Sequence, residues 1–502
     1  MPIHKTEPVT LTQGGELRGR ERDGALLFAG IPYAAPPVGR LRFRAPEPHP
    51  GWQGVRDARR FGPAAPQLPG TGLTAAPLAW EEDCLTLNVC TPALDEARRP
   101  VMVWIHGGGF RSGKGGIPWY DGRSFATRGD VVTVTINYRL GALGFAHLPD
   151  VGGAPCASSG LNGIRDQIFA LAWVQANIAA FGGDPERVTI AGESAGAMCV
   201  GTLLGCPDAR GLFRGAVAQS GAAHHVLEEA TAREIGGTLA RELHVEDLAG
   251  LQAAEVEDIL NAQQRIEARM ALRERDGSGG PGGMPFQPVV EGRILPRTPL
   301  EAVRAGAVQD VHLLVGTNRD ESTLFGQPEV DEERLQRIAG RLFEDSEGAV
   351  AAYRRSRPQA APPELATAFG TDQTFRIPAI RLLEAQSGAG GKAWQYLFTW
   401  RSRAFGGKLG ACHALEIPFT WNTLTHPGVD TFLGPGELPY ALADRIHGAW
   451  TAFFHEGDPA TPELGQWPCF DAKHRAVMEL GDRVGLLEDP DGETRVLWEG
   501  RR

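Results

Sequence analysis

A serine between two glycines, placed directly after an apolar run, constrains this chain more than any other feature. In VTIAGESAGAMCV, residues 188–200, Ser194 is the centre of a G-x-S-x-G pattern. The pattern alone is weak evidence, because 65 of the 502 residues are glycine. However, residues 188–190 predict a short buried strand, and the residues after Ser194 predict a helix. A serine on such a strand-to-helix turn, with mostly glycine and alanine around it, is typical of an exposed nucleophile.

Short apolar runs rich in β-branched residues recur along the chain and alternate with helical patterns. The runs lie within CLTLNVCTP, VMVWIHGGGF, VVTVTINYRLG, RVTIAG, GAVAQSG and DVHLLVGTN. Their lengths suit strands that are buried on both faces, and the segment 163–184 between two of them has helical spacing and a Gly-Gly stop. The alternation predicts an α/β fold with a mostly parallel central sheet flanked by helices.

Two other stretches are charged, amphipathic and helical. They span about 225–285 and 327–395. We expect them to be helical insertions around the active site of a single domain that covers residues 1–502. The alternative, surface helices with no role in binding, stays open for each stretch.

A glycine-rich loop earlier in the chain suits the stabilisation of a negatively charged oxygen. WIHGGGF, residues 104–110, follows a predicted buried strand. Glycines let the backbone approach a substrate and aim N–H groups at the oxyanion that develops during acyl transfer. We predict that the N–H groups of Gly108, Gly109 and Ala195 form this oxyanion hole and that Gly107 permits the turn.

A nucleophilic serine also needs a histidine base and an acid that orients the histidine. In hydrolases with this strand-turn-helix arrangement, the acid and then the histidine follow the serine along the chain. RDES offers Asp320 and Glu321 after a predicted strand, and position alone does not choose between them. GACHALEIPF offers His413. The other late histidines are interpreted as structural or exposed: His426, His447, His455 and His474.

The composition argues against several classes of function. A net charge of −11 disfavours a nucleic-acid binder and a protein that docks on anionic membranes. We find no apolar run of membrane-spanning length and no signal-peptide pattern at the N-terminus. The seven cysteines show no C-x-x-C pair and no metal-ligand spacing. We therefore expect a cytoplasmic protein with no metal and no cofactor.

Taken together, these motifs resemble the type B carboxylesterases, in the carboxylesterase and cholinesterase family, and most of all the bacterial p-nitrobenzyl-esterase-like branch. The resemblance covers roughly residues 15–480. It rests on segments in the family's order, which include FAGIPYAAPPVGRLRFRAPEP, EEDCLTLNV, INYRLGALGF, FRGAVAQSGA, FQPVVEG and GTNRDES beside the motifs above. It implies an α/β-hydrolase fold and a serine esterase that needs no cofactor.

The resemblance also implies roles for single residues. Ser194, Glu321 and His413 take the places of the family's nucleophile, acid and base. The supporting positions around them are taken by Ser220, Glu193 and Gly107. Two structural ion pairs of the family are matched by Arg139 with Asp166, and by Glu82 with Arg42 or Arg44.

Two departures from the family pattern are informative. Many members join a disulfide to the position of Cys84, but the partner position is Ala65 here, so we expect Cys84 to be unpaired. The loop before Cys84 also lacks a tryptophan where cholinesterases stack their cationic substrate. This absence argues against choline esters as substrates.

We expect a mostly apolar pocket that takes aryl or short- to medium-chain esters. Its candidate lining residues, each with core packing as the alternative, are Phe110, Leu227, Phe286, Phe325, Phe375 and Ile377. Two rival functions are a carbamate or amide hydrolase with the same residues, and a non-catalytic interaction protein, which would have lost the nucleophile. We expect a small-molecule ester substrate, a monomer with a dimer as the alternative, and no nucleic-acid or membrane partner.

Overall fold

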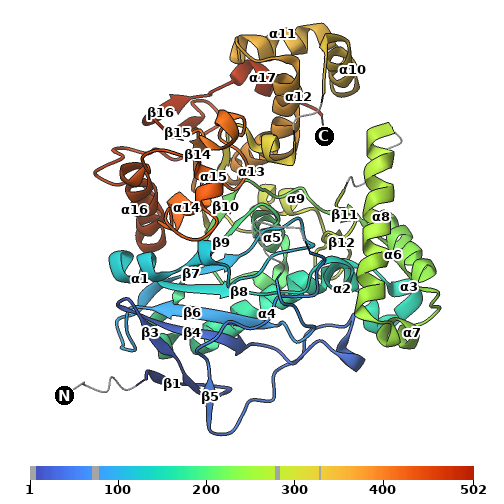
Figure 1. The fold of residues 1–502 in the computed structure, drawn as a ribbon, viewed down its shortest axis with the longest axis vertical. Coiled ribbons are helices and arrows are strands. Elements are labelled where there is room, and N and C mark those ends of the chain that lie inside the picture. The colour runs from blue at the N-terminus through green and yellow to red at the C-terminus, as the bar shows by residue number, and fades with distance from the viewer. Residues whose placement is uncertain (1–6, 70–77, 277–282, 327–328, 502) are drawn as a thin grey trace. The chain divides into compact units, whose positions relative to one another are not determined.

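The computed structural model describes residues 7–69, 78–276, 283–326 and 329–501, and in it the chain divides into two compact units (Figure 1). Unit 1 holds Met1–Val217 and Ala223–Ala302, and unit 2 holds Ala218–Ala222 and Val303–Arg502. Parts of three segments discussed above lie outside the described residues: the loop before Cys84 and the two expected insertions. Every described helix is too short or too polar to cross a membrane.

Unit 1 is built on a mixed sheet with the strand order β3-β4-β6-β8-β7-β9 (Figure 1). These strands are β3 (Arg20–Arg22), β4 (Ala25–Pro32), β6 (Thr86–Thr91), β7 (Arg99–Ile105), β8 (Val132–Ile136) and β9 (Gly183–Glu193). β7 pairs in parallel with β8 and β9, whereas the pairs from β3 to β8 along the other edge are antiparallel. Every residue of β6, β7 and β8 is buried, as the continuous apolar runs predict for strands covered on both faces.

The helices of unit 1 include two groups. The first follows the strands: α1 (Arg123–Gly129), α2 (Gly141–Phe145), α3 (Pro149–Gly152), α4 (Asn162–Asn177) and α5 (Ala195–Gly205). The second contains α6 (Glu229–Leu243), α7 (Leu248–Ala253) and α8 (Val256–Asp276), of which α6 and α8 lie side by side in Figure 1. Short strands complete the unit: β1 (Val9–Thr12), β2 (Gly15–Arg18), β5 (Val55–Asp57), β11 (Leu227–Glu228) and β12 (Val289–Val290). β10 (Gly215–Gln219) and α9 (Pro299–Arg304) run across the boundary between the units.

Unit 2 contains four neighbouring strands in the order β13-β14-β15-β16. β13 (His312–Asn318), β14 (Ala393–Phe398) and β15 (Ala476–Leu480) are parallel, and β16 (Val484–Glu488) is antiparallel to β15. The helices are α10 (Glu332–Leu342), α11 (Ser346–Ser356), α12 (Pro362–Thr371), α13 (Ile377–Gly388), α14 (Ile417–Thr420), α15 (Asp430–Leu433), α16 (Tyr440–Glu456) and α17 (Gly492–Val496).

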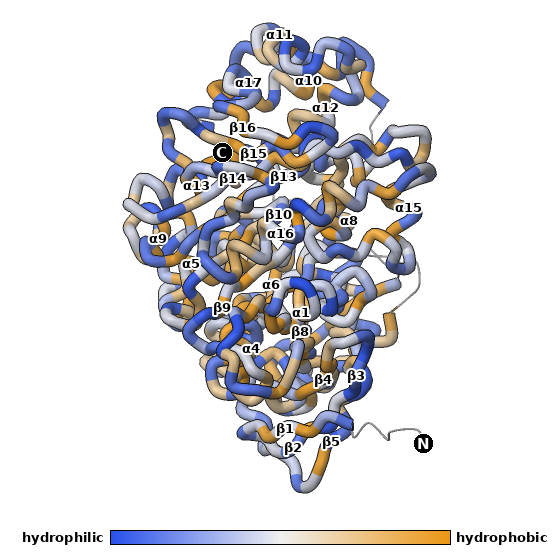
Figure 2. Tube along the Cα trace, turned by 90° about the vertical axis from the view of Figure 1, so that its left-hand side faces the viewer, coloured by the Kyte–Doolittle hydropathy of each residue, from blue (hydrophilic) through white to orange (hydrophobic). Residues whose placement is uncertain are grey.

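The amphipathic helices of unit 2 form where their sequence provides a cap and an apolar stripe. The side chain of Asp331 accepts a hydrogen bond from the N–H of Arg334, and so caps the first turn of α10. In Figure 2 the tube of α10 and α11 changes between hydrophilic and hydrophobic within each helix. The apolar positions meet in one cluster with α12, which includes Leu335, Phe343, Val350 and Phe369. Burial of this stripe stabilises helices that would be marginal alone.

Candidate active site

Ser194 lies on a strained turn between β9 and α5. Its backbone has φ 57° and ψ −127°, a conformation that costs a non-glycine residue about 1–3 kcal/mol. β9 ends at Glu193, α5 begins at Ala195, and the N–H of Met198 donates to the carbonyl of Ser194 at 2.9 Å. The turn therefore presents the serine at the N-terminus of a helix, where N–H groups without intrahelical partners gather.

The glycines on either side of Ser194 are required by close packing. A Cβ atom on Gly192 would lie 2.5 Å from the carbonyl carbon of Gly196, and one on Gly196 would overlap the carbonyl oxygen of Ile105. Ile105 is the last residue of β7, the strand beside β9. The G-x-S-x-G spacing thus lets the helix start directly against the end of the neighbouring strand.

The glycine loop after β7 packs against this turn. A Cβ atom on Gly107 would lie 2.7 Å from the carbonyl oxygen of Glu193 and 3.0 Å from the Cβ atom of Ser194. Gly108 and Gly109 have φ values of 114° and 61°, which glycine adopts without strain. The carbonyl of Gly108 accepts a hydrogen bond from the N–H of Ser112 at 3.0 Å. Among the described residues, the N–H groups of Gly108 and Gly109 donate no hydrogen bond to another backbone group outside helices and strands. The loop therefore leaves N–H groups near Ser194 for a ligand.

His106 lies at the start of the glycine loop, is buried and carries no charge at neutral pH. Its ring stacks on Tyr138 with centroids 4.6 Å apart, and the Tyr138 hydroxyl donates to the carbonyl of His106 at 2.8 Å. Burial lowers the pKa of His106 to about 4, so the imidazole is uncharged at neutral pH. The position of His106 leaves Gly113 no room for a side chain, because a Cβ atom there would overlap the ring.

In unit 2, Glu321 and His413 form a buried acid–base pair. The Nδ1 atom of His413 lies 2.7 Å from Oε2 of Glu321, and the other carboxylate oxygen of Glu321 accepts from the N–H of Asn318 at 2.7 Å. The N–H of His413 also donates to the carbonyl of Glu321 at 3.2 Å. Because Nδ1 is hydrogen-bonded to a carboxylate, Nε2 is the ring nitrogen positioned to exchange a proton.

Asp320, the neighbouring carboxylate, has other partners. It accepts from Nη1 of Arg357 at 2.8 Å and from the N–H of Ala411 at 2.9 Å. Of the two adjacent acids, Glu321 and not Asp320 therefore contacts His413.

A second buried acid, Glu416, lies behind the pair and was not singled out by the sequence. It accepts from Nδ2 of Asn318 at 2.6 Å and from Nε2 of Gln219 at 3.1 Å. Burial, reinforced by the negative charge of Glu321, raises the pKa of Glu416 to about 7. Ser220, next to Gln219, donates its N–H to the carbonyl of Gly316 at 2.9 Å, and its buried hydroxyl has no hydrogen-bond partner among the described residues. Glu416 lies in the HALEIP segment, so that motif was the available signal.

The profile of the carboxylesterase family matches residues 6–493. The chain belongs to the carboxylesterase family. It is 36% identical to para-nitrobenzyl esterase from Bacillus subtilis, with 98% of each chain covered, and 37% identical to phenmedipham hydrolase from Pseudarthrobacter oxydans, with 95% and 96% covered. A solved carboxylesterase from Geobacillus stearothermophilus has 38% identity and a TM-score of 0.86, with 98% of this chain and 99% of that chain covered.

These similarities confirm the predicted fold class and the predicted class of enzyme. The chain has the α/β-hydrolase fold of its structural neighbours and is an ester hydrolase of the carboxylesterase family. Catalytic triads and oxyanion holes are standard in this family. Within the described residues, no group of three or more His, Cys, Asp or Glu side chains is placed to hold a metal ion.

The six predicted pocket residues of this carboxylesterase lie in different surroundings. Phe325 and Phe375 flank His413, with ring centroids 5.3 and 4.8 Å from the imidazole, and Phe325 is 65% exposed. Phe110 is fully buried and packs edge-on against Phe145. The other three are buried: Leu227 in β11, Phe286 before β12, and Ile377 in the cluster of α10, α11 and α12.

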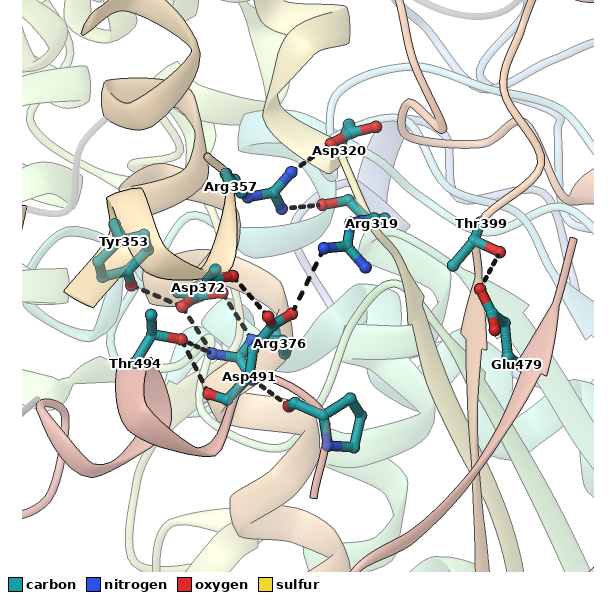
Figure 3. Close-up of polar contacts among 12 residues, drawn as sticks. Arg319, Asp320, Tyr353, Arg357, Asp372, Arg376, Thr399, Glu479, Asp491 and Thr494 are labelled. Atoms are coloured by element: carbon teal, nitrogen blue, oxygen red, sulfur yellow. Dashed lines mark hydrogen bonds and ion pairs between the residues drawn. The ribbon is translucent and has the colours of Figure 1, made fainter. Parts of the chain in front are cut away.

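Phe375 belongs to a π-helical turn, Asp372–Arg376, between α12 and α13. The N–H of Ile377 donates to the carbonyl of Asp372, five residues earlier. Pro378 follows at the start of α13 and has no N–H to donate to the preceding turn. The wider π-helical turn accommodates this missing hydrogen bond. Arg376 holds the turn, as Figure 3 shows, through contacts with Asp372 and Thr494. It donates two hydrogen bonds of 2.7 Å to Asp372 and one of 2.7 Å to the hydroxyl of Thr494.

The ion pairs implied by the family resemblance are present in unit 1. Both carboxylate oxygens of Asp166 accept from Arg139, at 2.7 and 2.8 Å, and both residues are buried. Of the two candidate partners of Glu82, Arg42 makes the contact, with Nη2 2.6 Å from Oε2. Cys84 is a buried free thiol.

Proposed function

We propose that this carboxylesterase is a serine hydrolase in which Ser194 is the nucleophile, His413 the base and Glu321 the acid. We further propose that the N–H groups of Gly108, Gly109 and Ala195 form the oxyanion hole. The strained elbow at Ser194 carries the proposal, because such strain persists only where the surrounding structure holds it in place. The 2.7 Å contact between His413 and Glu321 supports it independently.

Acylation would begin when Nε2 of His413 takes the hydroxyl proton of Ser194 as Oγ attacks the ester carbonyl. Glu321 fixes the imidazole in the tautomer with a proton on Nδ1 and stabilises the imidazolium that forms. The carbonyl oxygen becomes negative and is held by the three backbone N–H groups, each of which contributes about 3 kcal/mol in comparable enzymes. The alcohol then leaves with the proton from His413.

Deacylation repeats these roles with water as the nucleophile. His413 deprotonates the water, and the oxyanion forms again in the same place. The carboxylic acid product then leaves as Ser194 regains its proton from His413. The supporting positions are assigned to Gly107, Glu193 and Ser220. Gly107 suits this role because its position leaves room only for hydrogen between Glu193 and Ser194.

The substrate we propose is an aryl ester or an ester with a short to medium acyl chain. The rings of Phe325 and Phe375 beside His413 support an apolar substrate. Carbamate or amide hydrolysis is the second candidate, since carbamate hydrolases also belong to this family. A comparison of kcat/KM on a matched aryl ester, carbamate and anilide would separate the candidates.

We also propose a cytoplasmic monomer that contacts neither membrane nor nucleic acid. Six of the seven cysteines are buried free thiols, which suits a reducing compartment. Gel filtration with light scattering would test the oligomeric state directly.

The nucleophile is tested by Ser194→Ala. Turnover of p-nitrophenyl butyrate is expected to fall by about 10⁴ to 10⁶, while the circular dichroism spectrum stays unchanged. An organophosphate should add one label, found by mass spectrometry on the peptide that contains Ser194. Retained turnover in the alanine variant, or a label on another serine, would refute the assignment.

A further inference from the structure

Three arginines of unit 1 line a groove of about 190 Å³ for which the proposed reaction has no use. They come from distant parts of the sequence. Arg44 follows the helical turn Gly39–Leu41, Arg165 lies on α4, and Arg293 follows β12. Glu47 and Ser158 complete the polar lining, and the remaining lining residues are three alanines and a proline.

The three arginines differ from their neighbours because, among the described residues, no carboxylate pairs directly with their side chains. Their side chains form no hydrogen bond or ion pair with any residue that the structure describes. Nearby arginines are each paired with a carboxylate: Arg40 with Glu47 at 2.9 Å, Arg42 with Glu82 at 2.6 Å, and Arg139 with Asp166 at 2.7 Å. The groove therefore gathers the arginines of this region that are left unpaired.

The carboxylates near the groove are already engaged. Asp166, next to Arg165 in the chain, binds Arg139 with both oxygens, and Glu47 binds Arg40 with both oxygens at 3.1 and 2.9 Å. Glu291 accepts from the N–H of Ile294 at 2.5 Å, from the N–H of Arg293 at 3.2 Å and from the hydroxyl of Ser158 at 3.3 Å. These acids offset part of the local charge but leave the three guanidinium groups free to bind an anion.

The backbone that carries Arg44 is held rigidly. Nη1 of Arg139 donates to the carbonyl of Arg44 at 2.6 Å, and Nδ2 of Asn162 donates to the carbonyl of Phe43 at 2.9 Å. Burial lowers the pKa of Arg165 from its usual value, and the like charges of Arg139 and Arg293 act in the same direction, whereas the charges of Asp166 and Glu291 oppose them. Arg165 therefore lies beside like charges, and a bound anion would relieve their repulsion.

We infer that this groove binds a tetrahedral oxyanion with two negative charges: phosphate or the phosphate group of a phosphomonoester. Guanidinium groups present planar pairs of N–H donors that match phosphate oxygens, and they bind them in bidentate fashion. A dianion compensates more of three positive charges than a single carboxylate does. The open side of the groove leaves room for an ester substituent or for water.

Binding of inorganic phosphate tests the inference. Isothermal titration calorimetry on the full chain, in a chloride buffer of constant ionic strength, should give one saturable site. Arg165→Gln and Arg293→Gln should each weaken the Kd by about tenfold or more, because each removes charged hydrogen bonds. Arg210→Gln is the matched control, since it removes one charge from an exposed arginine outside the groove, and it should leave the Kd unchanged.

Binding of other anions identifies the class of ligand. Sulfate should bind within severalfold of phosphate, and acetate should bind much more weakly. Binding of glycerol 2-phosphate would identify a site for phosphomonoesters, whereas binding of inorganic phosphate alone would identify a site for the free ion. The inference is overturned if phosphate shows no saturable binding, if acetate binds as tightly as phosphate, or if Arg210→Gln weakens binding as much as Arg165→Gln. Arg293 is exposed, so its variant keeps the test valid if the Arg165 variant fails to fold.

Discussion

Asp320 and Glu321 are adjacent residues with the same functional group, yet the turn after β13 directs them to different partners. Glu321 contacts the imidazole of His413, whereas Asp320 pairs with Arg357. We therefore expect Glu321→Gln to lower kcat/KM by about 10³ to 10⁴, because an amide does not enforce the tautomer that accepts the serine proton. Asp320→Asn should keep most of the activity. Steady-state kinetics with p-nitrophenyl butyrate would measure both.

Asp320→Asn should affect the stability of the fold although it keeps most of the activity. Asp320→Asn weakens an ion pair with a partly buried arginine and is expected to cost about 1–3 kcal/mol of unfolding free energy. If Asp320→Asn instead abolished turnover in a folded protein while Glu321→Gln remained active, the acid would have to be reassigned.

Residues with a local constraint could be predicted from the sequence, and residues with a remote constraint could not. The glycines around Ser194 are needed by a turn only a few residues long, so the sequence of that turn is enough to predict them. The choice between Asp320 and Glu321 needed the family resemblance, because both are carboxylates at the same place. Glu416 was missed since its partners, Asn318 and Gln219, come from strands 98 and 197 residues away.

At the scale of elements, a buried ion pair holds the turn that carries Phe375. In Figure 3, Arg376 is bound by Asp372 and Thr494, and Asp372 also accepts from the hydroxyl of Tyr353 at 2.5 Å. Arg376→Gln would leave a buried carboxylate without its cation, so we expect it to cost about 3–5 kcal/mol of unfolding free energy, measured by urea titration. Activity should fall as well, because Phe375 lies 4.8 Å from the ring of His413.

Two comparisons make this prediction specific to the buried pair. The double variant Asp372→Asn with Arg376→Gln should recover part of the lost stability, since it removes the unpaired charge. Arg337→Gln is the control, because Arg337 forms an exposed pair with Glu333 four residues earlier on α10, and such pairs contribute about 0–1 kcal/mol. Equal losses for Arg376→Gln and Arg337→Gln would show that the turn does not depend on the pair.

The type of most elements could be predicted, but their pairing and irregularities could not. Continuous apolar runs predicted β6, β7, β8 and β9, because burial on both faces removes the alternation of polar residues. The antiparallel direction of β4 against β6 is set by partners that a single run does not reveal. The π-helical turn was also missed, since Pro378 in a helical pattern is compatible with a break, a kink or a bulge.

At the scale of the whole molecule, Glu416 makes unfolding depend on pH. Its pKa is about 7 in the folded chain against an ordinary value of 4.5, so folding favours its neutral form. Below pH 4.5 the carboxyl group is neutral in both states. Between pH 4.5 and 7 the unfolded chain loses the proton first, so stability falls as pH rises, and above pH 7 the loss is complete. The shift corresponds to about 3 kcal/mol.

Glu416→Gln isolates this contribution from those of the other titrating groups. Glutamine keeps an acceptor for Asn318 and carries no charge, so the variant should lack the decline. We therefore expect the free energy of unfolding of the wild type, relative to Glu416→Gln, to fall by about 3 kcal/mol from pH 4.5 to above pH 7, measured by urea titration at several pH values. A difference that stays constant with pH would mean that Glu416 titrates alike in both states. Folding would then not raise the pKa of Glu416, and the network around it would tolerate the charge.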